Sequence, residues 1–311
     1  MSRQRRAPQT RQRGVAVVTA MLLTTLAITI VASLFWQQQV QVRSIENQRL
    51  QLQKQWVLRG ALDWARLILR EDGKYSAIDD LREPWAVPLS ETRLDRYVES
   101  AALRGEATTA VLSGSIQDAQ ARMNLTALAS RGEINPVEVA AFEKLLGFLR
   151  QDPGLARATA QALAQSQRHA DAGTGVARMI GFDQVEDLLA VPGCTPTVLA
   201  AVRNYVVFLP RATPVNVNTA SAEVLAARMP WLSLADANLL ITYRRSASFH
   251  DLSQVAARLP NEPEPDPALL SVATSYFLVT GKVTIRQAGL QVQGLVERSG
   301  PATHLLWMSQ T

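Results

Sequence analysis

An uncharged run of 22 residues near the amino terminus constrains this chain more than any other feature. Val15 to Trp36 contain no Asp, Glu, Lys or Arg. As an α-helix the run extends about 33 Å, enough to cross the hydrocarbon core of a bilayer. Its few polar atoms are Thr and Ser hydroxyls, which can donate to carbonyls of their own helix. The sequence therefore predicts one transmembrane helix over residues 15–36.

A short basic leader, residues 1–14, precedes this run and ends at Gly14. It contains five arginines and no acidic residue. Positive flanks stay in the cytoplasm, so the rest of the chain is expected on the other side of the membrane. A cleavable secretory signal is the competing interpretation. The apolar run is too long for a signal core, and no Ala-x-Ala motif closes it.

The helix is predicted to continue well past the membrane. From Gln37 to Arg70 the chain has no proline and a single glycine, Gly60. Apolar residues recur there at intervals of mostly three or four, which predicts one face of a helix. The simplest prediction is one helix from about Val15 to Arg70, apolar in its first half and amphipathic in its second.

Outside the leader, the charge of the chain is balanced. Subtracting the five leader arginines from 32 basic residues leaves 27, equal to the 27 acidic residues. The bulk of the protein therefore has no positive field that would attract nucleic acid. The one cysteine, Cys194, excludes an intramolecular disulfide and is interpreted as a small buried apolar residue.

Strand patterns lie on both sides of a long helical region. The predicted strands follow the proline-containing loop 81–93 and cover residues 107–116, 277–285, 290–296 and 304–308, with turns at 287–289 and 299–301. Between the first strand and the last three, about 150 residues have helical patterns. The fold class is therefore α+β, with a helical block inserted into a small α/β domain.

A basic leader that ends in glycine, followed by a helix that changes from apolar to amphipathic, resembles the type IV prepilins and pseudopilins. This resemblance implies that a prepilin peptidase cuts between Gly14 and Val15 and that Val15 is then N-methylated. Most members carry Glu at the fifth mature position, where this chain has Thr19. A Glu there is tolerated when it meets a neighbouring subunit's amino terminus. A subunit with Thr19 does not need that neighbour and could stand at a fibre tip.

Further motifs resemble the minor pseudopilin K family of type II secretion, also called the general secretion pathway protein K family. The matching pieces are Gly14 with the anchor, Glu83 to Ala86, Asp118 to Leu125, Val191 to Pro210, Pro214 to Leu225 and Ser275 to Arg298. The resemblance implies a pilin-like fold, in which the long helix packs on a small antiparallel sheet. It also implies a large inserted all-α domain that contains SAM-like, or helix-hairpin-helix, modules.

The family layout gives the following expected boundaries. They are a prepilin leader at 1–14, a transmembrane helix at 15–36, a pilin-like domain made of 37–124 and 271–311, and an inserted helical domain at 125–270 whose two modules cover about 125–210 and 211–270.

The resemblance also implies a role. The chain would cap the periplasmic pseudopilus with minor pseudopilins I and J and start its assembly, for export of folded proteins across the outer membrane. Minor pseudopilin H, the major pseudopilin, the prepilin peptidase, the inner-membrane platform and secreted substrates are further expected partners. The expected location is the inner membrane of a Gram-negative cell, with a single span, a cytoplasmic amino terminus and a periplasmic globular part.

Calcium is bound by some members of this family, and here no metal site is assigned. Calcium takes six to eight oxygen ligands, several of them carboxylates. Where family members carry an acidic loop, residues 165–179 contain one acid, Asp171. Glu262, Glu264 and Asp266 lie among prolines and are interpreted as a solvated loop. No cofactor is expected.

The alternative function is that of a minor pilin of a type IV pilus or DNA-uptake machine, because the 215–255 region resembles helix-hairpin-helix modules that bind DNA. Those modules use glycines to bring backbone N–H groups to a phosphate. Here the second hairpin, Pro230 to Ser233, has no glycine, and the first, Pro192 to Thr195, has one. Both are interpreted as packing elements, so nucleic acid is an unlikely ligand.

Catalysis is not expected. Three histidines, at positions 169, 250 and 304, lie far apart in the sequence. No metalloprotease, nucleophile-elbow, P-loop or dinucleotide motif is present.

Overall fold

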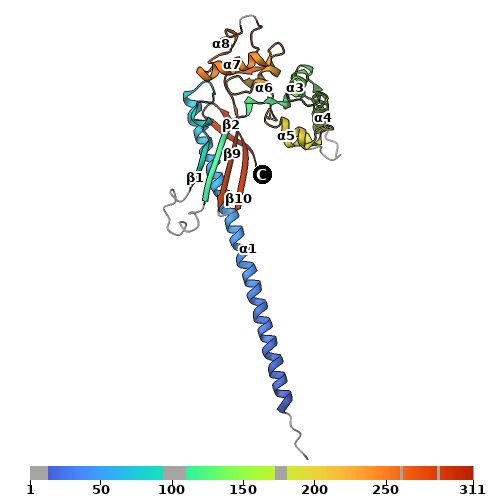
Figure 1. Cartoon of the computed structure of the whole chain (residues 1–311), viewed down its shortest axis with the longest axis vertical. Coiled ribbons are helices and arrows are strands. Elements are labelled where there is room, and N and C mark those ends of the chain that lie inside the picture. Colours follow the sequence, from blue (N-terminus) through green and yellow to red (C-terminus); the bar gives the residue numbers. More distant parts are fainter. Residues whose placement is uncertain (1–12, 94–109, 172–180, 260–261, 286–287, 311) are drawn as a thin grey trace, which may run out of the picture. The chain divides into compact units, whose positions relative to one another are not determined.

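A computed structural model describes residues 13–93, 110–171, 181–259, 262–285 and 288–310. The chain divides into two compact units, Met1–Trp56 and Val57–Thr311, which we describe separately. Helix α1 runs from Arg13 to Tyr75 and contributes to both (Figure 1). The single helix predicted for residues 15–70 is therefore confirmed, with two more residues at its start and five at its end. Residues 1–12 of the predicted leader lie outside the described part.

In the first unit, α1 is long and apolar enough to cross a membrane. The candidate span covers Val15–Ile45, 31 residues with a mean hydropathy of 2.4 in its most apolar window. Side chains of this span are exposed within the chain itself, so their burial has to come from lipid or from other chains.

The second unit contains a five-stranded antiparallel sheet in the order β1-β2-β9-β10-β11. The strands are β1 Leu89–Arg93, β2 Ala110–Asp118, β9 Tyr276–Ile285, β10 Ala288–Ser299 and β11 Ala302–Gln310. The three predicted carboxyl-terminal strands are thus confirmed (Figure 1). For the strand predicted at 107–116, residues 107–109 lie outside the described part, and β2 continues to Asp118.

The prediction of a loop over residues 81–93 holds for residues 81–88 and was wrong for residues 89–93. This segment forms a short 3-10 helix, η1 at Pro84–Ala86, and then strand β1. Strand β1 pairs with β2 through a register shift between Leu89 and Thr92. Pro88 has no backbone N–H to donate. It lies just before the strand, at a position where the pairing of an edge strand does not require that hydrogen bond. Proline content alone therefore misled the sequence prediction.

Helix α1 packs on one face of the sheet through apolar side chains. Leu62, Ala65 and Leu69 form a buried cluster with Phe277 and neighbouring strand residues. The ring of Trp85 meets that of Phe277 edge to face, with centroids 5.3 Å apart. Trp85 is thus buried, whereas Trp56 and Trp64 on α1 are 70% and 50% exposed.

The turn predicted at residues 299–301 joins β10 to β11. Gly300 has a φ of +57°, a left-handed conformation that glycine adopts without a Cβ clash. Strand β9 ends at Ile285 and β10 begins at Ala288, so the turn predicted at 287–289 falls partly outside the described residues, and its remainder is strand.

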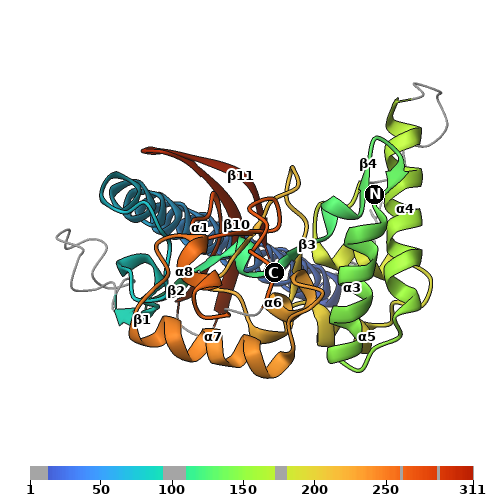
Figure 2. The same ribbon diagram turned by 90° about the horizontal axis from the view of Figure 1, so that it is seen from above.

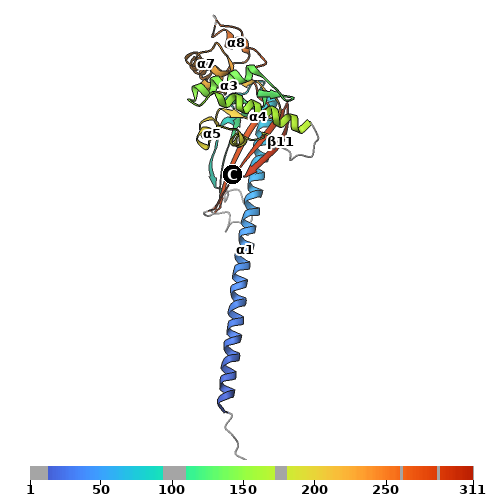
Figure 3. The same cartoon turned by 90° about the vertical axis from the view of Figure 1, so that its right-hand side faces the viewer.

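Helices and three two-stranded sheets, β3-β6, β4-β5 and β7-β8, are the other elements described in the second unit, and Figures 2 and 3 show α3 and α4 side by side. The short strands are β3 Met123–Asn124, β4 Ala129–Ser130, β5 Glu133–Ile134, β6 Val206–Val207, β7 Val215–Asn216 and β8 Leu270–Ser271. The helices are α3 Pro136–Phe148, α4 Gly154–Asp171, the 3-10 helix η5 Val185–Ala190, α5 Pro196–Val202, α6 Ala222–Arg228, α7 Leu234–Ser246 and α8 Leu252–Ala256. Most begin at a side chain that accepts a hydrogen bond from the first turn, such as Asn135 before α3 and Ser221 before α6. In the region with helical sequence patterns, residues 185–190 thus form a 3-10 helix rather than an α-helix.

One continuous hydrophobic core fills this helical region. It extends in the sequence from Met123 to Leu270 and includes Phe142, Leu146 and Leu225 among its fully buried side chains. Residues on both sides of the predicted module boundary at 210/211 belong to it. The fold is thus a set of helices with an antiparallel sheet, and the pilin-like and SAM-like boundaries stay predictions.

Candidate functional site

The first candidate site is the start of α1, where processing is predicted. Helix α1 begins at Arg13, so Gly14 and Val15 both have helical backbone. The predicted cut therefore lies in the first turn of the helix. Cleavage and methylation at this bond stay predictions.

Thr19 satisfies its own hydroxyl within the helix. Its Oγ1 donates to the carbonyl oxygens of Val15, at 2.9 Å, and of Ala16, at 3.0 Å. Such a hydroxyl enters a bilayer at little cost because its donor is already bonded. In contrast to a carboxylate, this side chain requires no charged group from a neighbouring subunit.

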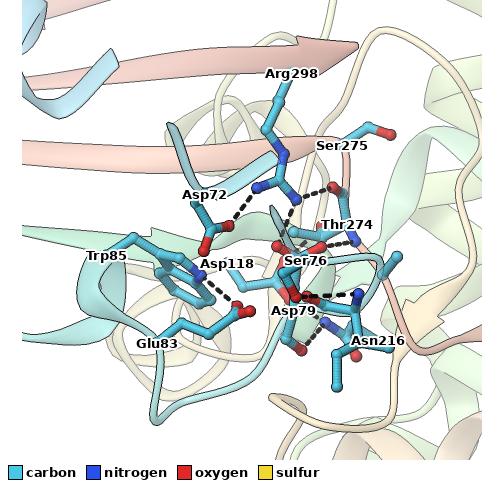
Figure 4. Close-up of polar contacts among 12 residues, drawn as sticks. Asp72, Ser76, Asp79, Glu83, Trp85, Asp118, Asn216, Thr274, Ser275 and Arg298 are labelled. Carbon is cyan, nitrogen blue, oxygen red and sulfur yellow. Dashed lines mark hydrogen bonds and ion pairs between the residues drawn. The ribbon is translucent and has the colours of Figure 1, made fainter. Parts of the chain in front are cut away.

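The second candidate site is a buried polar junction in the second unit (Figure 4). It joins the end of α1, the loop after it, the end of β2, strand β7 at Val215–Asn216, the segment before β9, and β10. Its central members are Asp72, Asp79, Asp118, Asn216, Thr274 and Arg298. Asp118, Asn216 and Arg298 lie within segments that carry the resemblance to the pseudopilin K family, and Thr274 directly precedes one of them.

Arg298 connects the sheet to the end of α1. Its Nη1 lies 2.6 Å from the Oδ2 of Asp72, and its Nη2 donates to the Oδ1 of Asp79. The same Nη2 also donates to the Thr274 carbonyl at 3.2 Å. All three charged side chains are less than a tenth exposed. A buried guanidinium with two carboxylates fixes the geometry of the segments that carry them.

Asp118 anchors the helical region to the end of β2. Its carboxylate accepts hydrogen bonds from the side chains of Thr219, Thr274 and Asn216 at 2.6, 2.7 and 2.9 Å. It also accepts one from the Gln120 backbone N–H at 2.7 Å. Burial raises the pKa of Asp118, and these four donors act against the shift. A single side chain thus ties together three chain segments, residues 118–120, residues 216–219 and Thr274.

Negative charge is in excess at the junction. Burial raises the pKa of Asp79 to about 6, although Arg298 and the Thr274 N–H favour its ionised form. Burial also raises the pKa of Asp72, and the nearby charge of Glu83 adds to the effect. The Glu83 carboxylate accepts from the Trp85 indole N–H at 2.8 Å. The junction therefore has more carboxylates than the one guanidinium can neutralise.

Asp72, Asp79 and Glu83 have carboxylate oxygens within 4.8 Å of one another, the one such acidic group among the described residues. Arg298 already donates to two of these three carboxylates. A calcium ion there would have to displace the guanidinium, so the residues do not fit the metal. Glu262, Glu264 and Asp266 are exposed, and the acid-poor loop lies mostly outside the described part. Metal binding stays unassigned.

The second hairpin, Pro230 to Ser233, directs carbonyl groups at a cation. Lys144 of α3 donates its Nζ to the carbonyls of Met229, Pro230 and Leu232 at 3.1, 2.9 and 3.0 Å. A phosphate nest presents N–H groups instead. This hairpin is therefore occupied by a lysine of its own chain, which fits the predicted packing role.

The first hairpin contains Gly193, whose φ is +91°, and Cys194, which is buried. Cys194 belongs to the hydrophobic core of the helical region, as predicted, and this burial raises the pKa of its thiol. The hairpin leads into α5, whose first turn is capped by Thr195.

Sequence reasoning missed the junction because its members lie up to 226 residues apart in the chain. The available signal was weak. Arg298 is the residue before the last in β10, and Asp118 is the last residue of β2. Charged residues at strand ends are ordinarily solvated, so neither position indicates burial.

Comparison with known proteins identifies the family. Two regions, residues 121–211 and 215–273, match family models described as type II secretion system (T2SS), protein K. These regions cover the helical part of the second unit. A protein of Pseudomonas aeruginosa, type II secretion system protein K, is 25% identical over 304 residues, which cover 88% of this chain and 85% of that protein.

The chain belongs to the type II secretion system protein K family. A solved structure extends this family likeness to the fold. It is the crystal structure of the GspK-GspI-GspJ complex from enterotoxigenic Escherichia coli. The match has a TM-score of 0.67 at 19% identity and covers 86% of this chain and 98% of the other.

Proposed function

We propose that this protein is a minor pseudopilin of a type II secretion system that caps the tip of the periplasmic pseudopilus. The observation that carries the proposal is the likeness to the GspK-GspI-GspJ structure, which extends over 98% of the matched chain. We infer that minor pseudopilins I and J bind this chain as well. Its role is then to start assembly of the fibre that exports folded proteins.

The two units suit this role. In the second unit, the last part of α1 packs on an antiparallel sheet, which supports a pilin-like domain. The helical region with its own continuous core supports an inserted SAM-like domain. Such an insertion is bulky for a subunit along a fibre shaft, and Thr19 needs no neighbour ahead of it. Both features favour the tip.

The same proposal gives the chain its location and its further partners. Val15–Ile45 anchors it in the inner membrane, with the basic leader in the cytoplasm and the second unit in the periplasm. The prepilin peptidase cuts after Gly14 and methylates Val15. Minor pseudopilin H, the major pseudopilin, the inner-membrane platform and secreted substrates are contacts of the assembled system. The mechanism is association rather than catalysis.

A secretion assay tests the function. In a strain that lacks this gene, we expect secreted enzymes to accumulate in the periplasm. The wild-type gene should restore their release into the medium. A variant with Arg157→Gln, a change at an exposed arginine of α4, is the matched control and should restore it equally. Normal secretion without the gene would contradict the proposal. A gel shift tests the alternative function in DNA uptake. That alternative requires salt-sensitive binding of DNA, which we do not expect.

A further inference from the structure

Strand β11 is a free edge of the five-stranded sheet. It stands last in the strand order β1-β2-β9-β10-β11 and pairs with β10. Its nine residues, Ala302–Gln310, make it a long edge strand. Six of the nine side chains are exposed, among them the apolar Leu305, Leu306 and Met308. A long, exposed and apolar edge is a template on which a strand of another chain can pair.

The other edge strand of the same sheet is protected. Strand β1 has five residues, follows Pro88, contains Glu91 and Arg93, and pairs with β2 through a register shift. Shortness, proline, charge and irregular pairing are the features by which proteins prevent strand addition. Strand β11 shares one of them, a register shift in its pairing with β10. It has no Asp, Glu, Lys, Arg or Pro, and its one titratable side chain, His304, lies opposite Glu297.

The backbone of β11 presents hydrogen-bonding groups to the free edge. Thr303 lies opposite Arg298, whose backbone N–H donates to the Ser275 carbonyl at 2.7 Å, on the side away from β11. Thr303 therefore makes no ladder bond to Arg298, and its carbonyl accepts instead from the Nη2 of Arg66 at 2.9 Å. Backbone groups alternate in direction along a strand, so those of Leu305 point to the same edge. Among the described residues, no group outside β10 other than Arg66 bonds to the β11 backbone, so the edge from Leu305 onward is open.

The partner that fits this edge is an extended and uncharged segment. A backbone in strand conformation presents N–H and C=O groups at the spacing of those on β11. Side chains of an added strand would lie beside Leu305, Leu306 and Met308, which offer apolar contacts and no counter-charge. Arg66, at the start of the edge, already pairs with Asp63 at 3.1 Å. A charged partner strand would therefore lose hydration without gaining an ion pair.

A second copy of this chain does not fit the edge. Antiparallel pairing of β11 with its own copy would relate the two sheets by a two-fold axis normal to their plane. That rotation reverses the direction of α1, which packs on one face of the sheet through Leu62, Ala65 and Leu69. Two α1 helices that both begin in the same membrane cannot run in opposite directions. This exclusion rests on the membrane anchor of the proposed function.

We propose that β11 binds an extended, uncharged segment of another protein, which adds to the sheet as a sixth strand antiparallel to β11. Antiparallel addition continues the pairing of the existing strands. Backbone hydrogen bonds supply the affinity, and the apolar side chains of β11 select against charge. The proposal adds a binding surface to the proposed function, so binding at this edge can fail while the tip complex forms, and the reverse.

Calorimetric titration of the full chain in neutral detergent tests the edge with three synthetic peptides. The first alternates valine and threonine over about seven residues and is N-methylated at every second residue, so that one of its edges can pair and it cannot stack into fibres. The second is N-methylated at every residue and has no pairing edge. The third is the first peptide with glutamate in place of valine. We expect the first peptide to bind at least about tenfold more tightly than either of the others, about 1.4 kcal/mol.

Variants assign the binding to the β11 backbone. Leu305→Pro removes an N–H that points to the free edge and leaves the donors that face β10, a position at which an edge strand tolerates proline. It should weaken the first peptide by about tenfold or more. Leu305→Thr is the matched control, because it changes the same side chain and keeps the N–H, and its affinity should stay within about threefold. Since the first and second peptides are compared on the unaltered protein, the test does not depend on the folding of a variant.

Several results would overturn the proposal. Failure of every peptide to bind, or equal binding of the first and second peptides, would show that the edge does not accept a strand. Undiminished binding by a folded Leu305→Pro variant would place the peptide elsewhere on the protein. Tighter binding of the glutamate peptide would contradict the uncharged partner. A dimer of the full chain in light scattering that Leu305→Pro dissociates would assign the edge to a second copy instead.

Discussion

Replacing Arg298 by methionine removes the cation from the buried junction while keeping most of the side-chain volume. In the folded protein this arginine pairs with Asp72 at 2.6 Å and with Asp79. Both carboxylates are buried, with side chains 7% and 1% exposed. After the substitution they keep their apolar surroundings and lose their counter-charge.

The expected loss follows from the cost of an unpaired buried charge. Removing one member of a buried ion pair destabilises a protein by about 3–5 kcal/mol. A folded domain has about 5–15 kcal/mol of stability in total, so Arg298→Met should remove a large part of it. The added change Asp79→Asn removes one of the stranded charges. The double variant should therefore be more stable than Arg298→Met alone.

Urea unfolding of residues 57–311 at pH 7.5, followed by circular dichroism, measures these differences. The control is Arg157→Met, which alters an arginine that is 72% exposed and 3.7 Å from its partner Glu143. Exposed pairs of this kind contribute about 0–1 kcal/mol. If Arg298→Met and the control lost equal stability, or if Asp79→Asn made the Arg298→Met variant still less stable, the reasoning about buried charge would be refuted.

Three further predictions concern the anchor, the junction and the hairpin. Gly14→Val should block processing, so mass spectrometry should find the leader still attached; a chain that is still trimmed by about 14 residues would exclude the proposed cut. Asp79 has a folded pKa of about 6, above its ordinary value of 3.8, so its protonation favours the folded state at low pH. Unfolding free energy should therefore fall by about 1 kcal/mol from pH 5 to pH 7, and Asp79→Asn should reduce this slope. Lys144→Met leaves three carbonyls without their donor and should cost about 1–3 kcal/mol in the same unfolding assay; an unchanged midpoint would show that water replaces the lysine.

Local patterns predicted the elements that depend on local physics. The length and the lack of charge of the run from Val15 are enough to indicate a membrane span. In the structure this run forms the first part of α1. Alternating apolar residues from Phe277 onward predicted β9, because one face of the strand packs on α1. Helix α3 has local start signals of the same kind, the cap Asn135 and the first-turn proline Pro136.

Features that depend on distant contacts were not predictable in this way. Strand β1 is short and follows Pro88. Its pairing with β2, and not its composition, makes it a strand. Arg298 and Asp72 meet only after the chain has folded, so their sequence neighbourhoods say nothing of the pair. Trp64 fits the apolar period of α1 and is nevertheless half exposed, because periodicity alone does not tell which face meets the sheet.

Co-purification tests the central claim, membership of the pseudopilus tip, most directly. The full chain is co-expressed with minor pseudopilins I and J of the same organism, and a tag on this chain is used for capture from detergent extract. We expect all three to elute together in equal amounts and to keep one mass by light scattering through size exclusion. If this chain elutes alone while I and J bind each other without it, the tip assignment is contradicted.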